Sequence, residues 1–404
     1  MRLFGLAFIF PNLVLYVTAG DVIIGKKMNR KFKRLIFLLA FFIFAFQVST
    51  LAIIGYKYGV KPDLSQKVID QDVQTAFADW LTRYVTDEGC PKGTLRIHRH
   101  QAYDFDTVSE GIGWGMLITV LVDDNDSQKY FDGFWRYYKH YLNDYGLMSW
   151  QIDKKGKVIG LDSATEADEN VAMALLYADQ RWQSSGEINY LKEAKDLIAK
   201  ILSFEVEAST YVVKGGGAWG GSSNTNPAYF DPAYYKVWLN FDKDWQKVSD
   251  RSFEIYDIFY NKYETGLFPD WCNIKGAPTN LSYDYKYDAC QVPLKLGLNY
   301  LWWGEGGKYL EKFNDWLIKE TAGEPLAIVD GYRLDGSVIG KYHNAAFVGP
   351  MVVSAMVSKK YQKWLNKLYL HLVGLQTGGR WGYYQDTLRL ISMVIIAGKM
   401  PPSQ

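Results

Sequence analysis

The stretch SEGIGWGM, residues 109–116, places an acid among glycines and a tryptophan at the start of a predicted helix. A carboxylate in a first helical turn is favoured by the helix dipole and by the free amide groups, so Glu110 has a plain structural explanation. The small neighbours and Trp114 also leave room for a ligand to approach this carboxyl and to stack on a ring. The stretch alone leaves both interpretations open.

Two further acidic helix starts follow along the chain. Glu166 and Asp168 stand directly ahead of a strongly apolar helix face, and Thr165 and Asp168 have capping-box spacing. Asp288 precedes a helix whose first turn contains Pro293. Each acid could simply cap its helix. However, carboxylates crowded together raise one another's pKa, which is useful for proton transfer and otherwise costs stability.

Three such starts beside aromatic residues indicate hydrolysis of a glycosidic bond. This reaction needs one protonated carboxyl for the leaving oxygen and one ionised carboxylate to activate water or attack. The chain has five histidines but no HExxH motif, and it has neither a GxSxG nucleophile elbow nor a GxxxxGK[ST] phosphate loop. Its three cysteines lack CxxC spacing, so we expect no metal or other cofactor.

Composition points to a sugar rather than a nucleic acid as the partner. The 45 basic and 44 acidic residues nearly cancel, which leaves no global field to attract nucleic acid. Aromatic residues form 16% of the chain, and their flat faces suit the apolar faces of sugar rings. The side chains that we predict for sugar stacking or binding are Trp114, Trp219, Tyr229, Tyr234, Tyr383 and Gln291.

Helical periodicity returns along most of the chain, with irregular aromatic stretches such as residues 212–235 between the segments. Successive helix pairs with long loops suggest a closed ring of helical hairpins that collects its loops at one end. No change in composition divides residues 60–404 into two domains. The predicted helices are 66–85, 110–122, 128–142, 166–183, 187–203, 244–263, 291–303, 306–320, 345–357, 360–369 and 385–397.

Residues 35–55, LIFLLAFFIFAFQVSTLAIIG, carry no charge and are long enough to span a bilayer. The basic stretch KKMNRKFKR precedes them, which predicts that residues 1–34 stay in the cytoplasm and that the bulk of the protein faces outward. An uncleaved signal anchor, followed by a tether at residues 56–64, is favoured over a cleaved signal peptide and a secreted form.

The first residues leave two questions open. Met28 is followed by basic residues and the apolar segment and could itself be the first residue of the protein, so residues 1–27 could be an upstream extension. Within them, the apolar stretch LFGLAFIFPNLVLYV leaves a second spanning helix open, although proline and asparagine interrupt it.

Six motifs in order resemble glycoside hydrolase family 8 and cover most of residues 65–401. They are SEGIGWGM, SATEADENVAMALLYADQRW, NPAYFDPAYY, GLFPDW, YDACQVPLKLGLNY and YYQDTLRLISMVIIAGKMP. The resemblance implies an all-α fold, an (α/α)6 barrel with an open cleft, and no metal cofactor. It also implies endo-acting, inverting hydrolysis of β-1,4-linked or mixed β-1,3/1,4 glycans.

The same resemblance assigns roles to the acidic helix starts. Glu110 is expected to be the general acid, Asp288 the general base, and the start at Glu166 and Asp168 the part that binds the sugar at the cleavage point. The family's pattern reads Ala-Ser/Thr-Asp-Ala/Gly-Asp, so Glu166 is one methylene longer than its counterpart. Gln291 stands where the family commonly has an arginine; without that cation, we expect the pKa of Asp288 to be less depressed.

Members of this family encoded beside polysaccharide synthases trim polymer outside the cell. The anchor therefore predicts a β-linked exopolysaccharide or cellulose-like polymer as substrate and a polysaccharide synthase complex as partner. Glu166 and Gln291 keep an alternative open, a catalytically weak or inactive glycan-binding or assembly protein. A polysaccharide lyase or epimerase would need basic residues for uronic acids, unlike these acidic motifs.

Overall fold

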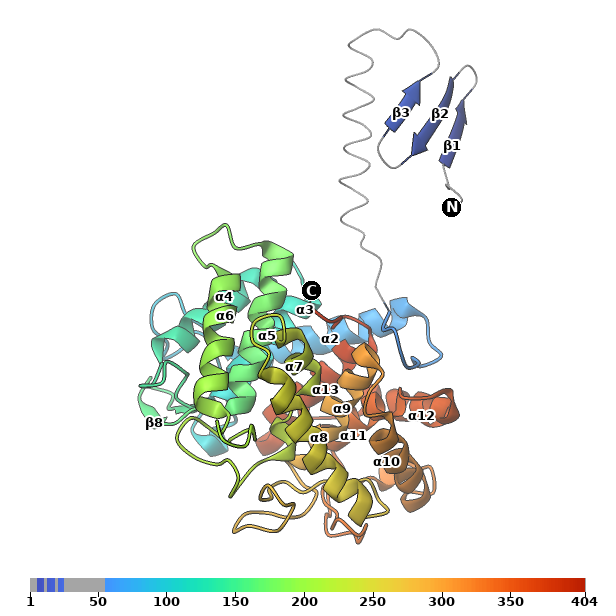
Figure 1. Cartoon of the computed structure of the whole chain (residues 1–404). Coiled ribbons are helices and arrows are strands. Elements are labelled where there is room, and N and C mark those ends of the chain that lie inside the picture. Colours follow the sequence, from blue (N-terminus) through green and yellow to red (C-terminus); the bar gives the residue numbers. More distant parts are fainter. Residues whose placement is uncertain (1–5, 11–12, 19–20, 25–54, 404) are drawn as a thin grey trace. The chain divides into compact units, whose positions relative to one another are not determined.

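The computed structural model describes residues 6–10, 13–18, 21–24 and 55–403, and the chain divides into two compact units at residue 54. In the first unit, β1 (Leu6–Phe10), β2 (Leu13–Thr18) and β3 (Asp21–Ile24) pair antiparallel in that order (Figure 1). The stretch for which the sequence left a second spanning helix open therefore contains strands.

The predicted membrane segment, residues 35–55, lies outside the described residues except for Gly55. Among the residues that are described, no helix has the length and apolar character needed to cross a membrane. The anchor thus stays a prediction.

Helices dominate the second unit, and within residues 55–403 they form neighbouring pairs in which one helix is almost fully buried and its partner is amphipathic (Figure 1). The buried helices are α3 (Ser109–Val122), α5 (Thr165–Trp182), α7 (Pro232–Trp238), α9 (Val292–Trp303), α11 (Ala345–Ala355) and α13 (Gly382–Ile396). Their partners are α2 (Gln66–Tyr84), α4 (Ser127–His140), α6 (Tyr190–Lys200), α8 (Trp245–Lys262), α10 (Gly307–Glu320) and α12 (Gln362–Gly374).

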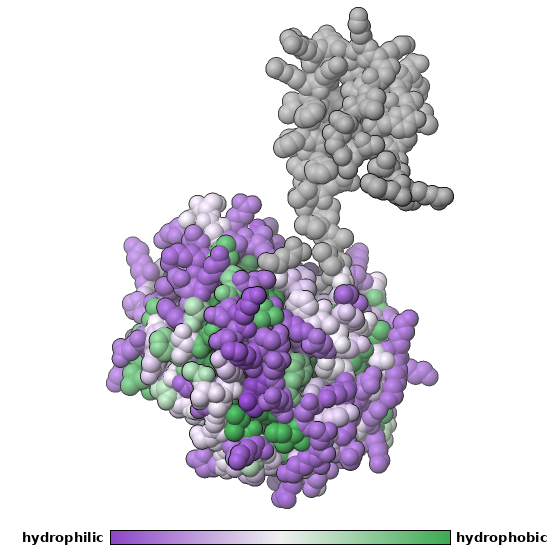
Figure 2. Space-filling view, viewed as in Figure 1, coloured by the Kyte–Doolittle hydropathy of each residue, from purple (hydrophilic) through white to green (hydrophobic). Residues whose placement is uncertain are grey.

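The buried helices contact one another in chain order, and α13 returns to α3. The contact between α5 and α7 includes hydrogen bonds from the Tyr234 hydroxyl to Asn170, 3.2 Å, and from the Tyr235 hydroxyl to Glu169, 2.8 Å. This closed ring is consistent with the barrel that the sequence predicts. Hydrophilic residues cover much of the visible outer face of this unit (Figure 2), as expected for amphipathic outer helices.

The predicted helices agree with the structure to within a few residues, except that α7 was not predicted; it begins within the stretch 212–235, which was expected to be irregular, and ends at Trp238. Its seven residues are too few to show helical periodicity, and the surrounding glycines, asparagines and prolines are typical of a loop. The prediction was wrong here because burial against α5, α8 and α9 stabilises a helix that is too short to be recognised alone.

The glycines of SEGIGWGM serve the packing of helices. A Cβ at position 113 would lie 2.7 Å from the Ala167 carbonyl oxygen of α5, and one at position 111 would lie 2.7 Å from the Tyr383 hydroxyl of α13. The space that the sequence suggested for a ligand is thus filled by neighbouring helices. Their close approach brings the acidic start of α3 next to the acidic start of α5 and to the first turn of α13.

Short strands cover the region where α3 begins. A two-stranded sheet contains β4 (Val85–Thr86) and β5 (Arg96–Ile97). A three-stranded sheet contains β6 (Thr107–Val108), β7 (Gln151–Ile152) and β8 (Val158–Gly160) in that order. Because β6 leads directly into α3, its pairing with β7 fixes the position of the first turn of α3.

Candidate active site

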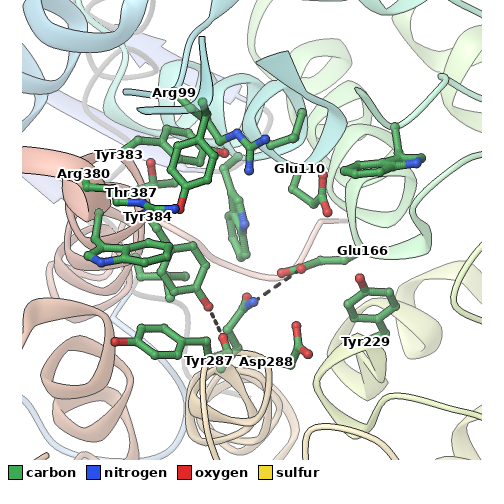
Figure 3. A pocket seen from close by; sticks show the side chains of 17 residues that line it. Arg99, Glu110, Glu166, Tyr229, Tyr287, Asp288, Arg380, Tyr383, Tyr384 and Thr387 are labelled. Carbon is green, nitrogen blue, oxygen red and sulfur yellow. Dashed lines mark hydrogen bonds between the residues drawn. The ribbon is translucent and has the colours of Figure 1, made fainter. Parts of the chain in front are cut away.

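The N-terminal ends of α3, α5, α9 and α13 surround a pocket of about 250 Å³ (Figure 3). Glu110, Glu166 and Asp288 line it, and Figure 3 shows the Glu166 carboxyl between the other two in this view. The structure therefore brings together one acid from each of the three helix starts that the sequence singled out. Of the predicted binding residues, Trp114, Tyr229, Tyr383 and Gln291 also line this pocket.

Glu110 lies in the first turn of α3 and is partly exposed to the pocket. Burial raises the pKa of Glu110 above its ordinary value, while its own backbone amide and the nearby Arg99 oppose this rise. Ser109 Oγ lies 3.5 Å from Glu110 Oε2. A carboxyl in such surroundings holds its proton to higher pH, which suits a proton donor.

Asp288 stands just before η4 (Ala289–Gln291), the short helix that leads into α9. The Trp271 indole N–H donates to Asp288 Oδ2 at 2.9 Å, which fixes the direction of the carboxyl. Burial and the neighbouring Asp270 raise the pKa of Asp288 to about 8. The sequence predicted a less depressed pKa because an arginine is missing, whereas the causes in the structure are burial and a second carboxylate.

Asp270 holds the turn that carries Asp288. Its Oδ1 accepts hydrogen bonds from the backbone amides of Lys286, Asp288 and Ala289, at 3.2, 3.1 and 2.8 Å. Ser282 Oγ donates to its other oxygen at 2.7 Å. The motif GLFPDW therefore supplies both the tryptophan that orients Asp288 and the acid that shapes its loop, a role that the sequence alone did not reveal.

The two positions that depart from the family pattern contact each other. Gln291 Nε2 donates to Glu166 Oε2 at 3.4 Å, and both side chains are buried at the pocket wall. Burial raises the pKa of Glu166 to about 7, while Lys295 opposes the rise. Glu166 Oε1 and Gln291 Oε1 have no hydrogen-bond partner among the described residues. Such buried oxygens are free to accept from a bound ligand.

A buried ion pair lies behind Glu166 and Trp114. Lys295 Nζ is 2.8 Å from Asp231 Oδ2, and both side chains are fully buried. The same ammonium group lies 5.3 Å from the centre of the Trp114 ring. Lys295 thus supplies a fixed positive charge that favours the ionised form of Glu166.

Three predicted site residues lie away from the pocket lining. Asp168 is fully buried, accepts a hydrogen bond from the Tyr138 hydroxyl, and points toward α4 instead of the pocket. Tyr234 is also buried and belongs to the contact between α5 and α7. Trp219 is exposed, and its ring centre lies 5.0 Å from that of Trp271. The positions of Asp168 and Tyr234 therefore do not support the predicted direct contact with a sugar in this pocket.

Several lining residues were not predicted. The aromatic residues among them lie in loops or at helix starts. Trp381 and Tyr384 fall within RWGYY, an aromatic run that could have indicated them. The basic ones, Arg99 and Arg380, gave no signal because single arginines are common on surfaces. The aromatic and basic lining residues that were not predicted are Arg99, Tyr103, Trp150, Tyr287, Arg380, Trp381 and Tyr384.

Residues 65–398 match the family described as Glycosyl hydrolases family 8. The chain belongs to this family. It is 39% identical over 348 residues to Endoglucanase A of Acetivibrio thermocellus, covering 83% of this chain and 71% of the relative. It is 33% identical over 365 residues to Beta-glucanase of Niallia circulans, covering 84% of this chain and 87% of the relative.

Solved structures agree with this assignment. The apo structure of a β-1,3-1,4-glucanase from Paenibacillus sp. X4 matches with a TM-score of 0.81 and 32% identity, covering 86% of this chain and 97% of the other. Rex8A from Paenibacillus barcinonensis, complexed with xylose, matches with a TM-score of 0.73 at 17% identity, covering 85% and 96%, and shows the shared fold. This family-8 protein is therefore a mostly helical glycoside hydrolase.

Proposed function

We propose that this family-8 hydrolase is an endo-acting, inverting enzyme built on an (α/α)6 barrel, and that it cleaves β-1,4-linked or mixed β-1,3/1,4 glucans. The observation that carries the proposal is the meeting of Glu110 and Asp288, from separate helix starts, at one aromatic-lined pocket. Inversion uses one carboxyl as acid and the other as base for a water on the opposite face of the sugar.

Glu110 is the proposed acid. Its raised pKa keeps it protonated beyond the range of an ordinary glutamate, so it can donate to the leaving glycosidic oxygen. Asp288 is the proposed base, and the Trp271 indole N–H stabilises and orients its ionised form. Because the pKa of Asp288 is about 8, the ionised fraction of this base increases with pH through the neutral range.

Glu166 and Gln291 are the proposed sugar-binding pair at the cleavage point. Each has a buried oxygen without a partner in the part of the chain that the structure describes, and each lines the pocket, as Trp114 does. Sugar hydroxyls are donors that would satisfy both oxygens, while the Trp114 ring faces the apolar side of a pyranose. Glucan as the substrate class is supported by the printed names of the relatives, endoglucanase and β-glucanase.

The predicted membrane segment at residues 35–55 and the basic residues before it support action outside the cell on a nascent exopolysaccharide beside its synthase. Deleting the protein would then lengthen the chains or change the amount of cell-surface polysaccharide. Unchanged chain length and amount would contradict this part of the proposal.

The decisive experiment incubates the full-length chain with mixed-linkage β-glucan, carboxymethyl-cellulose, xylan and chitosan. We expect reducing ends from the two glucans, an early fall in viscosity typical of endo cleavage, and loss of both in Glu110→Gln. Binding of the glucans without any Glu110-dependent cleavage would instead support the catalytically weak binding protein, which a largely protonated Asp288 at neutral pH favours.

A further inference from the structure

We propose that the rim of the pocket holds a carboxylate-bearing substituent of the glycan, and that Arg380 is the residue that binds it. This inference rests on the proposed function only in that the glycan lies in this pocket. It adds a preference for an acidic glucan over a neutral one. The three acids of the pocket, Glu110, Glu166 and Asp288, would not predict such a preference.

Arg380 stands on η7 (Gly379–Trp381), just ahead of α13, and its side chain is exposed. Its guanidinium carbon lies 5.2 Å from the ring centre of Tyr103 and 5.0 Å from that of Trp381. Both rings line the pocket, and Trp381 is 50% exposed. Stacking on aromatic rings leaves the edge of the guanidinium, with its N–H donors, free for a ligand.

The other arginine of the pocket already has its anion. Arg99 makes two hydrogen bonds to the Asp106 carboxylate, Nε to Oδ1 at 2.7 Å and Nη2 to Oδ2 at 2.5 Å, and Gln151 also donates to Asp106 at 2.6 Å. Arg380 differs: within residues 55–403 no carboxylate lies within ion-pair distance of its guanidinium. Arg380 is thus a pocket cation that has no ion-pair partner among the residues that the structure describes.

The Tyr103 ring brings the two cations together. The Arg99 guanidinium lies 4.3 Å from its centre, so both arginines pack against one ring, but only Arg99 is paired with Asp106. An anionic ligand at Arg380 would use the planar fork of donors, which matches a carboxylate.

Arg380 and Glu166 lie on different sides of the pocket (Figure 3). In Figure 3, Arg380 lies on the side of the pocket away from Glu166 and Tyr229. A sugar ring in contact with the exposed part of Trp381 would lie beside Arg380, whose guanidinium carbon is 5.0 Å from the centre of the same ring. The neutral backbone of the glycan then passes the three acids, and the acidic substituent stays at the rim.

The test compares two celluloses matched in degree of substitution, carboxymethyl-cellulose and the uncharged hydroxyethyl-cellulose, with the purified full-length chain. The readout is the ratio of kcat/KM on the acidic polymer to that on the neutral one. We expect Arg380→Gln to lower this ratio about three- to tenfold, as for a partly exposed bidentate pair. Arg333→Gln, an exposed arginine outside the pocket, is the matched control and should leave the ratio unchanged.

Raising the salt concentration to about 0.5 M should bring the wild-type ratio down toward that of Arg380→Gln, because salt screens an exposed pair. An unchanged ratio in Arg380→Gln would overturn the inference. So would an equal loss on both polymers, since Arg380 would then act only through packing.

A binding arm separates this inference from the proposed function. With Glu110→Gln, calorimetry compares a cello-oligosaccharide oxidised to carboxylate at C6 with its neutral parent. If neither polymer is cleaved, the proposed function fails. The rim site still stands if the acidic sugar binds more tightly than the neutral one and if adding Arg380→Gln to the Glu110→Gln variant removes that difference. Equal binding of both sugars overturns the rim site.

Discussion

Glu166 and Asp168 stand two residues apart at the start of α5, yet the structure gives them opposite surroundings. Two positions along a helix differ by about 200° around its axis, so the two side chains leave α5 on different sides. Glu166 meets the pocket and keeps an unpaired oxygen there, whereas Asp168 meets the Tyr138 hydroxyl of α4 in the core. The role of each acid follows from the side on which it leaves the helix.

The same contrast holds for the wider groups to which they belong. The pocket acids, Glu110, Glu166 and Asp288, share a cavity that a ligand can enter. The core acids, which include Asp168, Glu169 and Asp231, contact tyrosine hydroxyls or Lys295. Burial raises the pKa values of both groups, so a raised pKa alone does not distinguish an acid that serves catalysis from one that serves packing.

The largest expected effect is a loss of catalysis without a loss of stability, in a variant of a pocket acid. Asp288→Asn removes the proposed base and should lower kcat about 10²- to 10⁴-fold. Its melting temperature should be unchanged or higher, because the native pKa of Asp288 lies above the value in an unfolded chain, so that at neutral pH folding requires this carboxyl to take up a proton. Turnover on β-glucan and thermal unfolding test this together. A kcat near that of wild type would remove Asp288 from the mechanism.

Substitutions in the core group should change the free energy of unfolding. Lys295→Met leaves Asp231 buried without its cation, which typically costs about 3–5 kcal/mol in the free energy of unfolding. Denaturant unfolding measures the loss, and the double variant Lys295→Met with Asp231→Leu should recover much of it. A single variant as stable as wild type would show that the pair contributes nothing to the fold.

Asp168→Ala sharpens the contrast on α5 itself. The change removes the acceptor of the buried Tyr138 hydroxyl, so the free energy of unfolding should fall by about 1–3 kcal/mol. Because Asp168 lies outside the pocket lining, kcat per folded molecule should stay close to wild type. A hundredfold loss of kcat in a fully folded variant would return Asp168 to the catalytic group.

The smallest effect concerns the pH profile. The charge of Asp270 raises the pKa of Asp288, so Asp270→Asn, which keeps an oxygen for the three backbone amides, should lower that pKa. Activity requires ionised Asp288; the acidic limb of the kcat/KM profile should therefore move to lower pH. An unmoved limb, or one displaced to higher pH, would show that Asp270 does not set the ionisation of the base.

The sequence predicted the acids at helix starts, the family and the helical character, because acidic caps, apolar periodicity and motif order are local signals. It could not distinguish Glu166 from Asp168, since the pattern of α5 does not tell which neighbour each side faces. It missed α7 and Asp270 because a seven-residue helix and a loop-shaping acid depend on contacts distant in sequence. The glycines of SEGIGWGM were interpreted as space for a ligand, and helix packing fills that space instead.

The most direct test of the central claim, that Glu110 and Asp288 act as acid and water-activating base, is the configuration of the first product. Proton NMR of the full-length chain acting on mixed-linkage β-glucan follows the anomeric protons before mutarotation. The account predicts that the α-anomer appears first, because water attacks opposite the leaving group. Initial release of the β-anomer would mean a covalent intermediate and would contradict the assigned roles of both carboxyls.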